Sequence, residues 1–136
     1  MAARWCDEGE TSVGNVYLKA TAKPDLYLGL YKTSEPGEAD TMAAVVEADT
    51  PGQHGYARIQ LLDADWTEQA TPGVFKNLQK TFTASGAAWG SILGYFITTA
   101  ATGTAGKLVA EELFSDGPYT VNDGWSAKVT AQITVS

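Results

Sequence analysis

Residues 125–135, WSAKVTAQITV, form an almost unbroken string in which apolar and polar side chains alternate with a period of two. Successive side chains of a β-strand point to opposite faces, so this string places its alanine, valine and isoleucine residues on one face. Its serine, lysine, threonine and glutamine residues then share the other face. The string predicts that the chain ends as a β-strand with one face on a core and the other in water.

Comparable stretches recur upstream and predict further strands at 25–32, 56–62, 74–84, 89–98 and 107–114. The stretch 89–98, WGSILGYFIT, carries no charge, as expected for a central strand that is covered on both faces. The turn ATGTAG at 101–106 joins it to the next strand as a hairpin. Segments rich in turn-forming residues lie at 33–41, 51–55 and 115–124, while 42–48 suits either a helical turn or a short strand.

A helix is expected near the N-terminus. Asp7 and Glu10 have the spacing of a capping box, and the next apolar residues recur at helical intervals: Val13, Val16, Tyr17 and Ala20. Pro24 prevents the helix from continuing. The pattern predicts a short amphipathic helix over about residues 8–20.

Roughly seven or eight short strands separated by turns are typical of an antiparallel sandwich or a small barrel. We therefore predict an all-β fold, an antiparallel β-sandwich that is jelly-roll-like and has one short N-terminal helix, with an immunoglobulin-like sandwich as the alternative. A length of 136 residues, 44% of them hydrophobic, suits one domain. We expect an N-terminal arm at 1–6 and a single sandwich domain at 7–136.

The charge balance argues against several classes of partner. Nine lysine and arginine residues stand against sixteen aspartate and glutamate residues, for a net charge of -7. Such a surface repels phosphate and anionic lipid, so we expect no nucleic-acid and no membrane partner. The N-terminus lacks the apolar core of a secretory signal, and the lone Cys6 cannot form an internal disulfide. We expect a soluble protein made inside a cell.

No arrangement of residues predicts catalysis. His54 is the only histidine, and it lies in a glycine-rich turn, where an exposed side chain without an orienting shell is the default. Cys6 suits a small packing residue. The acidic residues Asp63, Asp65, Asp116 and Asp123 suit turns better than a calcium loop or a glycosidase pair. We expect no enzyme activity, no catalytic residue, no cofactor and no metal site.

Exposed aromatic and basic residues are the candidates for partner binding. The arm and the helix supply the first group, Arg4, Trp5 and Tyr17, since an arm that does not fold back leaves its tryptophan free to dock. Strand ends and turns supply the second group, Tyr56, Arg58 and Trp66. We expect that removal of residues 1–6 leaves the domain folded and weakens assembly.

Several short motifs resemble those of a known family. The segments CDEGETSVGNVYL, DLYLGLYKTSEP, GYARIQL, GYFITT and AEELF are similar to segments of small structural proteins of tailed bacteriophages. The resemblance runs from about Cys6 to Ser136. It implies a virion structural protein, and some members of that family resemble capsid cement or decoration proteins with a jelly-roll fold.

From this resemblance we expect a capsid cement or decoration protein that binds the major capsid protein and stabilises the shell. Small contacts gain strength there because the shell repeats the same site many times. The protein would be synthesised in the host cytoplasm, associate as a dimer or trimer, and lie on the capsid surface of the virion. The alternative is a tail, baseplate or fibre-associated component with a carbohydrate-binding tip.

Overall fold

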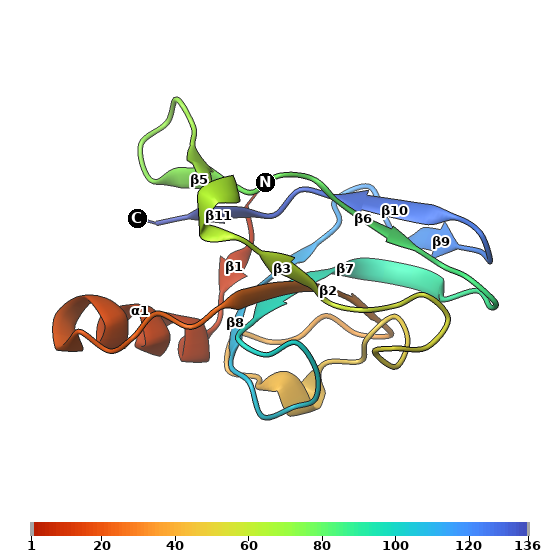
Figure 1. Cartoon of the computed structure of the whole chain (residues 1–136), viewed down its shortest axis with the longest axis horizontal. Coiled ribbons are helices and arrows are strands. Elements are labelled where there is room, and N and C mark those ends of the chain that lie inside the picture. Colours follow the sequence, from red (N-terminus) through yellow and green to blue (C-terminus); the bar gives the residue numbers. More distant parts are fainter. Residues whose placement is uncertain (1, 136) are drawn as a thin grey trace.

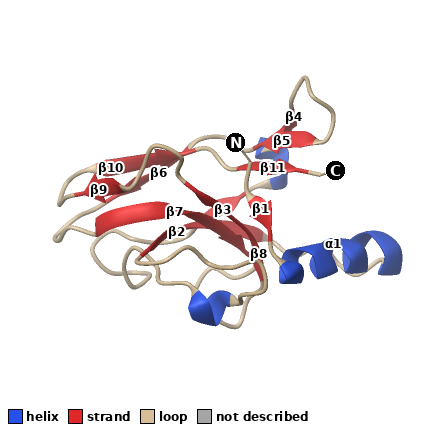
Figure 2. Ribbon diagram, turned by 180° about the vertical axis from the view of Figure 1, so that it is seen from behind, coloured by secondary structure: helices blue, strands red, loops and turns tan. Residues whose placement is uncertain are grey.

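Two layers of antiparallel strands make up the body of the molecule (Figures 1 and 2). This computed structural model describes residues 2–135, so Met1 and Ser136, the ends of the expected arm and domain, lie outside it. The first layer is a six-stranded sheet in the order β1-β8-β7-β2-β3, with β9 also paired to β7. Its strands are β1 (Arg4–Trp5), β2 (Leu26–Lys32), β3 (Ile59–Leu61), β7 (Gly90–Thr98), β8 (Leu108–Leu113) and β9 (Tyr119–Val121).

The second layer consists of two short sheets. In one, β10 (Ser126–Val129) pairs with β6 (Lys80–Thr83), and in the other, β11 (Gln132–Thr134) pairs with β5 (Val74–Lys76), which also pairs with β4 (Thr67–Glu68). Apolar side chains of both layers form the core between them. The helix α1 (Asp7–Lys19) projects from one side of the body (Figure 2). The predicted antiparallel sandwich with one N-terminal helix is confirmed.

The uncharged strand β7 is central, as predicted. It pairs with β2 on one edge and with β8 and then β9 on the other. Its inner face packs on the main core, while its outer face, at Phe96, contributes to a second apolar cluster with Tyr31 and Met42. The loops on that side of the sheet cover this cluster (Figure 1). Gly94 permits the close strand pairing, because a Cβ there would collide with the main chain of Glu112.

The long strands predicted at 74–84 and 125–135 are each broken in two, which corrects the prediction. Both breaks occur at the same level of the second layer, where the Asn77 N–H donates to the Ala131 carbonyl at 3.0 Å. Next to the break, the Gln132 N–H donates to the Tyr95 hydroxyl at 3.1 Å. A core tyrosine thus satisfies a main-chain group that the interrupted ladder leaves free. The buried side chains of 125–135 keep their alternation through the break. In 74–84 the inward-facing set shifts by one residue, from Phe75 and Asn77 before the break to Phe82 and Ala84 after it, so the continuous alternation predicted there is wrong.

The shorter elements correct or resolve the sequence-based expectations. The strand predicted at 56–62 is regular only over Ile59–Leu61. The ambiguous segment 42–48 begins with a 3₁₀ turn, η1 (Met42–Ala44), and a second 3₁₀ turn, η2 (Asp63–Asp65), precedes β4. Strand β9 lies within 115–124, where only turns were expected, because its short run of extended residues lies between two turn signals.

Only the first turn of α1 is held against the sheet. Gly9 is buried and lies against Val109 of β8 so closely that a Cβ would collide with that residue's main chain. The helix begins one residue earlier than the capping-box pattern implies. Cys6 occupies the N-cap position without a side-chain hydrogen bond, so the Asp7–Glu10 capping box is wrong. Beyond the first turns the helix extends into solvent, and Tyr17 and Leu18 are 87% and 81% exposed.

Candidate interaction site

The N-terminal residues expected as a free arm are part of the sandwich. Arg4 and Trp5 form β1 and pair with Glu111 and Ala110 of β8, and the Ala3 N–H donates to the Gln132 carbonyl at 2.7 Å. The indole N–H of Trp5 donates to the Thr134 carbonyl at 2.9 Å. This segment therefore ties the two layers together. Trp5 is not a free anchor.

Arg4 is engaged by acidic residues around the buried side chain of Glu111. One guanidinium nitrogen lies 2.7 Å from the Glu111 carboxylate, which also accepts a hydrogen bond from the Tyr31 hydroxyl at 2.9 Å. Burial raises the pKa of Glu111 above the usual glutamate range, against the lowering effects of Tyr31 and Arg4. The nearby carboxylate of Glu35 raises it further. This cluster fastens β1 to the sheet rather than presenting Arg4 to a partner.

Tyr56 and Arg58 are buried, so the structure corrects their assignment to the surface. Tyr56 is fully buried, and Arg58 is 7% exposed. The Arg58 guanidinium makes two hydrogen bonds to the Glu47 carboxylate, at 2.9 and 2.8 Å, and Tyr56 donates to the same carboxylate at 2.9 Å. Arg58 also donates to carbonyls of the loop after β7, at Ala100 and Gly103. These groups are satisfied within the fold.

Of the remaining two candidates, Tyr17 is accessible and Trp66 is not free. Trp66 is half-buried against the main core and directly follows a turn with two ion-paired acids. Asp63 lies 2.7 Å from Lys23, and Asp65 lies 3.0 Å from Lys80. Tyr17 projects from the free half of α1. Among the six residues predicted for partner binding, Tyr17 is the most exposed.

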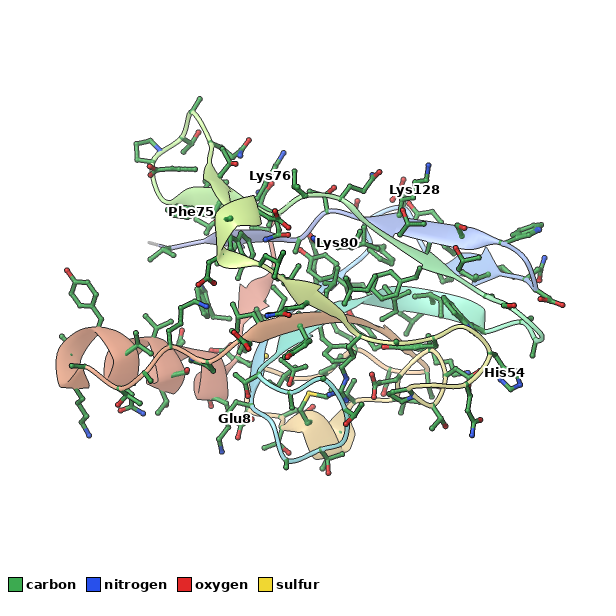
Figure 3. The ribbon with its side chains drawn as sticks, viewed as in Figure 1. Glu8, His54, Phe75, Lys76, Lys80 and Lys128 are labelled. Carbon is green, nitrogen blue, oxygen red and sulfur yellow. The ribbon has the colours of Figure 1, made fainter. Side chains whose placement is uncertain are left out.

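The residues with reactive side chains stand apart from one another. Figure 3 shows His54 on a loop at the end of the molecule away from α1, and its Nδ1 lies 2.7 Å from the Asp49 carboxylate. Cys6 is fully buried, and burial raises the pKa of its thiol to about 12, which disfavours the reactive thiolate. Asp123 accepts a hydrogen bond from the Gly86 N–H, and Asp116 accepts one from the Tyr119 hydroxyl. Within residues 2–135, no group of three or more His, Cys, Asp or Glu side chains is placed to hold a metal ion.

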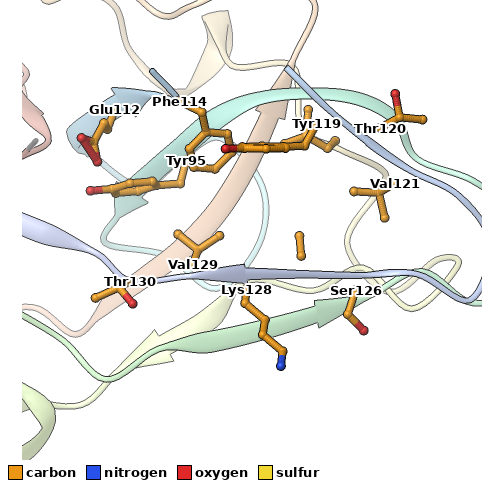
Figure 4. Close-up of a pocket in the computed structure, with 12 residues that line it drawn as sticks. Tyr95, Glu112, Phe114, Tyr119, Thr120, Val121, Ser126, Lys128, Val129 and Thr130 are labelled. Atoms are coloured by element: carbon orange, nitrogen blue, oxygen red, sulfur yellow. The ribbon is translucent and has the colours of Figure 1, made fainter. Parts of the chain in front are cut away.

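A cavity of about 440 Å³ opens where the two layers part, between β9 and β10 (Figure 4). Its size is within the range of ligand sites. The first layer supplies one wall with three aromatic rings: Tyr95, Phe114 and Tyr119. The ring centres of Phe114 and Tyr119 lie 5.3 Å apart at 61°, and those of Tyr95 and Phe114 lie 6.2 Å apart. The second layer supplies the opposite wall from β10.

The polar side chains of β10 do not point into this cavity. Figure 4 shows Ser126 and Lys128 turned away from the aromatic wall, while Val129 points toward it. On the first layer, Glu112 is the one carboxylate among the lining residues. Burial raises the pKa of Glu112, although a hydrogen bond from Tyr95 lowers it. The cavity thus combines apolar walls, one acid and the main chain of β10.

Sequence reasoning missed this cavity because none of its aromatic residues was selected. Tyr119 lies in a segment for which the sequence predicts only turns, and Tyr95 and Phe114 lie in the predicted strands 89–98 and 107–114. The available signal was the tyrosine itself. A large aromatic residue between the turn signals SDGP and NDG has no obvious role in a turn.

Comparison with known proteins gives one family. A sequence model described as podophage GP4 fiber I protein gp80 matches residues 5–135. No curated protein matches the chain. In residues 2–135, no helix has the length and apolar character needed to cross a membrane.

Proposed function

The chain belongs to the podophage GP4 fiber I protein gp80 family and is a structural protein of a bacteriophage virion, and from this premise we propose that it is a component of the podophage tail-fibre apparatus. The observation that carries the proposal is the family match over residues 5–135, which spans both layers and α1. The virion class agrees with the resemblance found in the sequence. The position in the virion is the part that we propose.

The family description favours the alternative expected from the sequence over the main expectation. It names a fibre protein, whereas a cement protein belongs to the capsid shell. Binding to the major capsid protein, self-association as a dimer or trimer, and a place on the capsid surface therefore stay predictions without further support. The absence of a nucleic-acid partner also stays a prediction, for which the net charge of -7 is the argument.

We propose that the protein acts through packing and contact, without catalysis. Its core holds two layers together, and the first turn of α1 is fixed to β8. The free half of the helix then projects as a rigid extension, with Tyr17 and Leu18 exposed. Such a body is suited to being a fixed part of a larger assembly, and the neighbouring exposed side chains of Tyr17 and Leu18 are the part of α1 that a contact would cover.

Reconstruction of purified virions by electron cryo-microscopy tests the proposed position. The two-layer sandwich with its projecting helix is a recognisable shape, and we expect density of this shape at the tail. Mass spectrometry of the same particles gives the copy number relative to the major capsid protein. We expect a small ratio, in keeping with a fibre.

A different distribution would overturn the fibre assignment. If the sandwich occupied equivalent positions over the whole capsid shell, in numbers close to those of the major capsid protein, the cement role would replace it.

A matched pair of variants, compared by the same copy number per virion, tests whether the exposed end of α1 makes the contact. Tyr17→Ser with Leu18→Ser removes exposed apolar groups from α1, and Leu78→Ser removes one, itself 60% exposed, from the second layer as a control.

A further inference from the structure

The edge of β10 that faces the cavity has main-chain groups without a partner strand. Within residues 2–135, β10 pairs only with β6. The Ala84 N–H donates to the Trp125 carbonyl at 2.9 Å, which identifies these two residues as a hydrogen-bonded pair at the start of the ladder. Bonded and non-bonded pairs alternate along an antiparallel ladder.

The alternation identifies which residues of β10 face outward. The next pair, Ser126 with Thr83, is non-bonded, as is Lys128 with Thr81, and a 2.7 Å contact between the Ser126 and Thr83 hydroxyls agrees with the closer side chains of such pairs. The N–H and C=O groups of Ser126 and Lys128 therefore point away from β6. They lie along the lip of the cavity, whose lining includes both residues.

The opposite lip is also a strand edge. Strand β9 pairs only with β7 among the described strands, and its residues Tyr119 to Val121 line the cavity. Because the polar side chains of Ser126 and Lys128 are turned away, the polar groups that β10 offers to the cavity are those of its main chain (Figure 4). A free main-chain edge above apolar walls is what an extended peptide segment recognises.

The molecule already closes the neighbouring half of the same gap in this way. Residues 3–5 are extended, pair with β8 on the first layer, and contact β11 on the second through the Ala3–Gln132 hydrogen bond. Strands β8 and β9 follow one another along the edge of β7, and β10 precedes β11 in the second layer. The half between β8 and β11 is thus occupied by the chain's own segment, and the half between β9 and β10 is open.

We propose that the cleft between β9 and β10 receives an extended segment of a neighbouring virion protein. The segment pairs its main chain with Ser126 and Lys128 and places alternate apolar side chains against Tyr95, Phe114 and Val129. This contact goes beyond the fibre assignment, because it specifies how a partner is bound wherever the protein lies in the virion. On the β10 wall a saccharide would find no polar side chain of the strand, because those of Ser126 and Lys128 point away, whereas an extended peptide uses the main chain of β10.

The charges around the cleft specify the partner further. Glu112 lines the cavity, and Asp116 comes two residues after Phe114 of the aromatic wall. The ammonium group of Lys128 is on the far side of β10. The whole chain carries a net charge of -7. The segment is therefore one in which small or medium apolar residues alternate with polar ones and a lysine or arginine lies beside Glu112.

Proline substitution at an outward-facing position tests the contact. Lys128→Pro removes an N–H that β6 does not use, so the β10–β6 ladder is kept, while Lys128→Thr loses the same charge and keeps the N–H. Both variants are introduced into the phage, and their copies per virion are counted by mass spectrometry. We expect Lys128→Pro to lower the copy number roughly tenfold and Lys128→Thr to leave it within about twofold of wild type. Equal copy numbers for the two variants would overturn the proposal.

Hydrogen exchange keeps the test decisive if Lys128→Pro does not fold. In wild-type virions, the amides of Ser126 and Lys128 should exchange at least about tenfold more slowly than in the free chain, because a partner carbonyl accepts them. Unchanged exchange at both amides overturns the proposal. Protection from exchange that is confined to the loop around Trp125, and that appears on addition of host-surface polysaccharide, also overturns the proposal. It would assign the end of the molecule near Trp125 to saccharide binding. Neither result depends on whether the protein is found at the tail or on the capsid.

Discussion

The two halves of one gap between the layers differ in how they are closed. Between β8 and β11, residues 3–5 pair with the first layer and bond to the second, and the Trp5 indole reaches the Thr134 carbonyl. Between β9 and β10, no described segment lies across the gap, and a cavity of about 440 Å³ remains. The N-terminus supplies an extended segment to one half of the gap only, and in our proposal a partner supplies one to the other half.

The closed half also holds the charged groups that fasten it. Glu111 accepts from both Arg4 and Tyr31 in a buried position. The open half has Glu112 one residue further along the same strand, in the lining of the cavity. Stability should therefore depend strongly on the closed half and weakly on the open half.

Removal of residues 2–5 should have the largest effect. The deletion takes away the β1–β8 pairing, the Ala3–Gln132 hydrogen bond and the packing of Trp5, so we expect the free energy of unfolding to fall by about 4 kcal/mol or more. Urea titration followed by circular dichroism measures it. This expectation replaces the earlier one that the shortened chain keeps its fold unharmed. A loss below about 1 kcal/mol would mean that the segment does not hold the layers together.

Trp5→Ala should have the next largest effect. The side chain is half-buried and its N–H is bonded, so we expect a loss of about 2–3 kcal/mol in the free energy of unfolding. Trp5→Phe keeps much of the packing and should cost about 1 kcal/mol. Equal losses for the two variants would contradict the separation of packing from the hydrogen bond to Thr134.

The buried carboxylate of Glu111 should give the closed half a dependence on pH. Its pKa is raised in the folded state, so the unfolded chain loses this proton at lower pH than the folded chain does. Stability should therefore fall as the pH rises from the ordinary glutamate pKa to the raised one, by at most about 1.4 kcal/mol per pH unit.

Glu111→Gln isolates this contribution, because the amide does not titrate. Subtracting its pH profile of unfolding free energy from that of wild type should leave a difference that declines over that window and is flat above it. A difference that rises over the same window would show that Arg4 and Tyr31 outweigh burial at this site.

Tyr119→Ala on the open half should have the smallest effect. The ring is 43% exposed and borders an empty space, so we expect a loss below about 1 kcal/mol in the same urea titration. Phe82→Ala, in the main core, is the contrasting control and should cost about 3–5 kcal/mol. If Tyr119→Ala matched that control, the open half would be as firmly packed as the core.

The strands that were predicted well share one property. In β2, β7 and β8 the pattern of apolar residues coincides with a long run of main-chain pairing whose register shifts lie near its ends, after Tyr31 and after Ile97, so composition and periodicity suffice. The stretch 125–135 keeps its alternation through a break that depends on Asn77 and Tyr95, residues far apart in the sequence. The stretch 74–84 shifts its inward-facing set by one residue at the same break. Only the folded arrangement reveals such a break.

The candidate site was less predictable than the fold for a similar reason. The sequence predicts Tyr56 and Arg58 to be exposed residues near a turn. In the structure both are buried and donate hydrogen bonds to Glu47, which comes from a separate loop. The cleft arises from the absence of a neighbour beside β10, and a sequence pattern reports faces of a strand but not its edges. Tyr17 is 87% exposed, and its position depends only on the helix that carries it; its role in partner binding stays a prediction.

Residue-resolved hydrogen exchange of the isolated protein tests most directly whether one half of the gap is closed and the other open. The amides of Ala3 and Cys6, which donate to Gln132 and Val109, should exchange slowly, and those of Ser126 and Lys128 should exchange quickly, while their neighbours Ala127 and Val129 are protected. Equal protection of the four β10 amides, those of residues 126–129, would contradict the account. Rapid exchange at Ala3 and Cys6 would contradict it too.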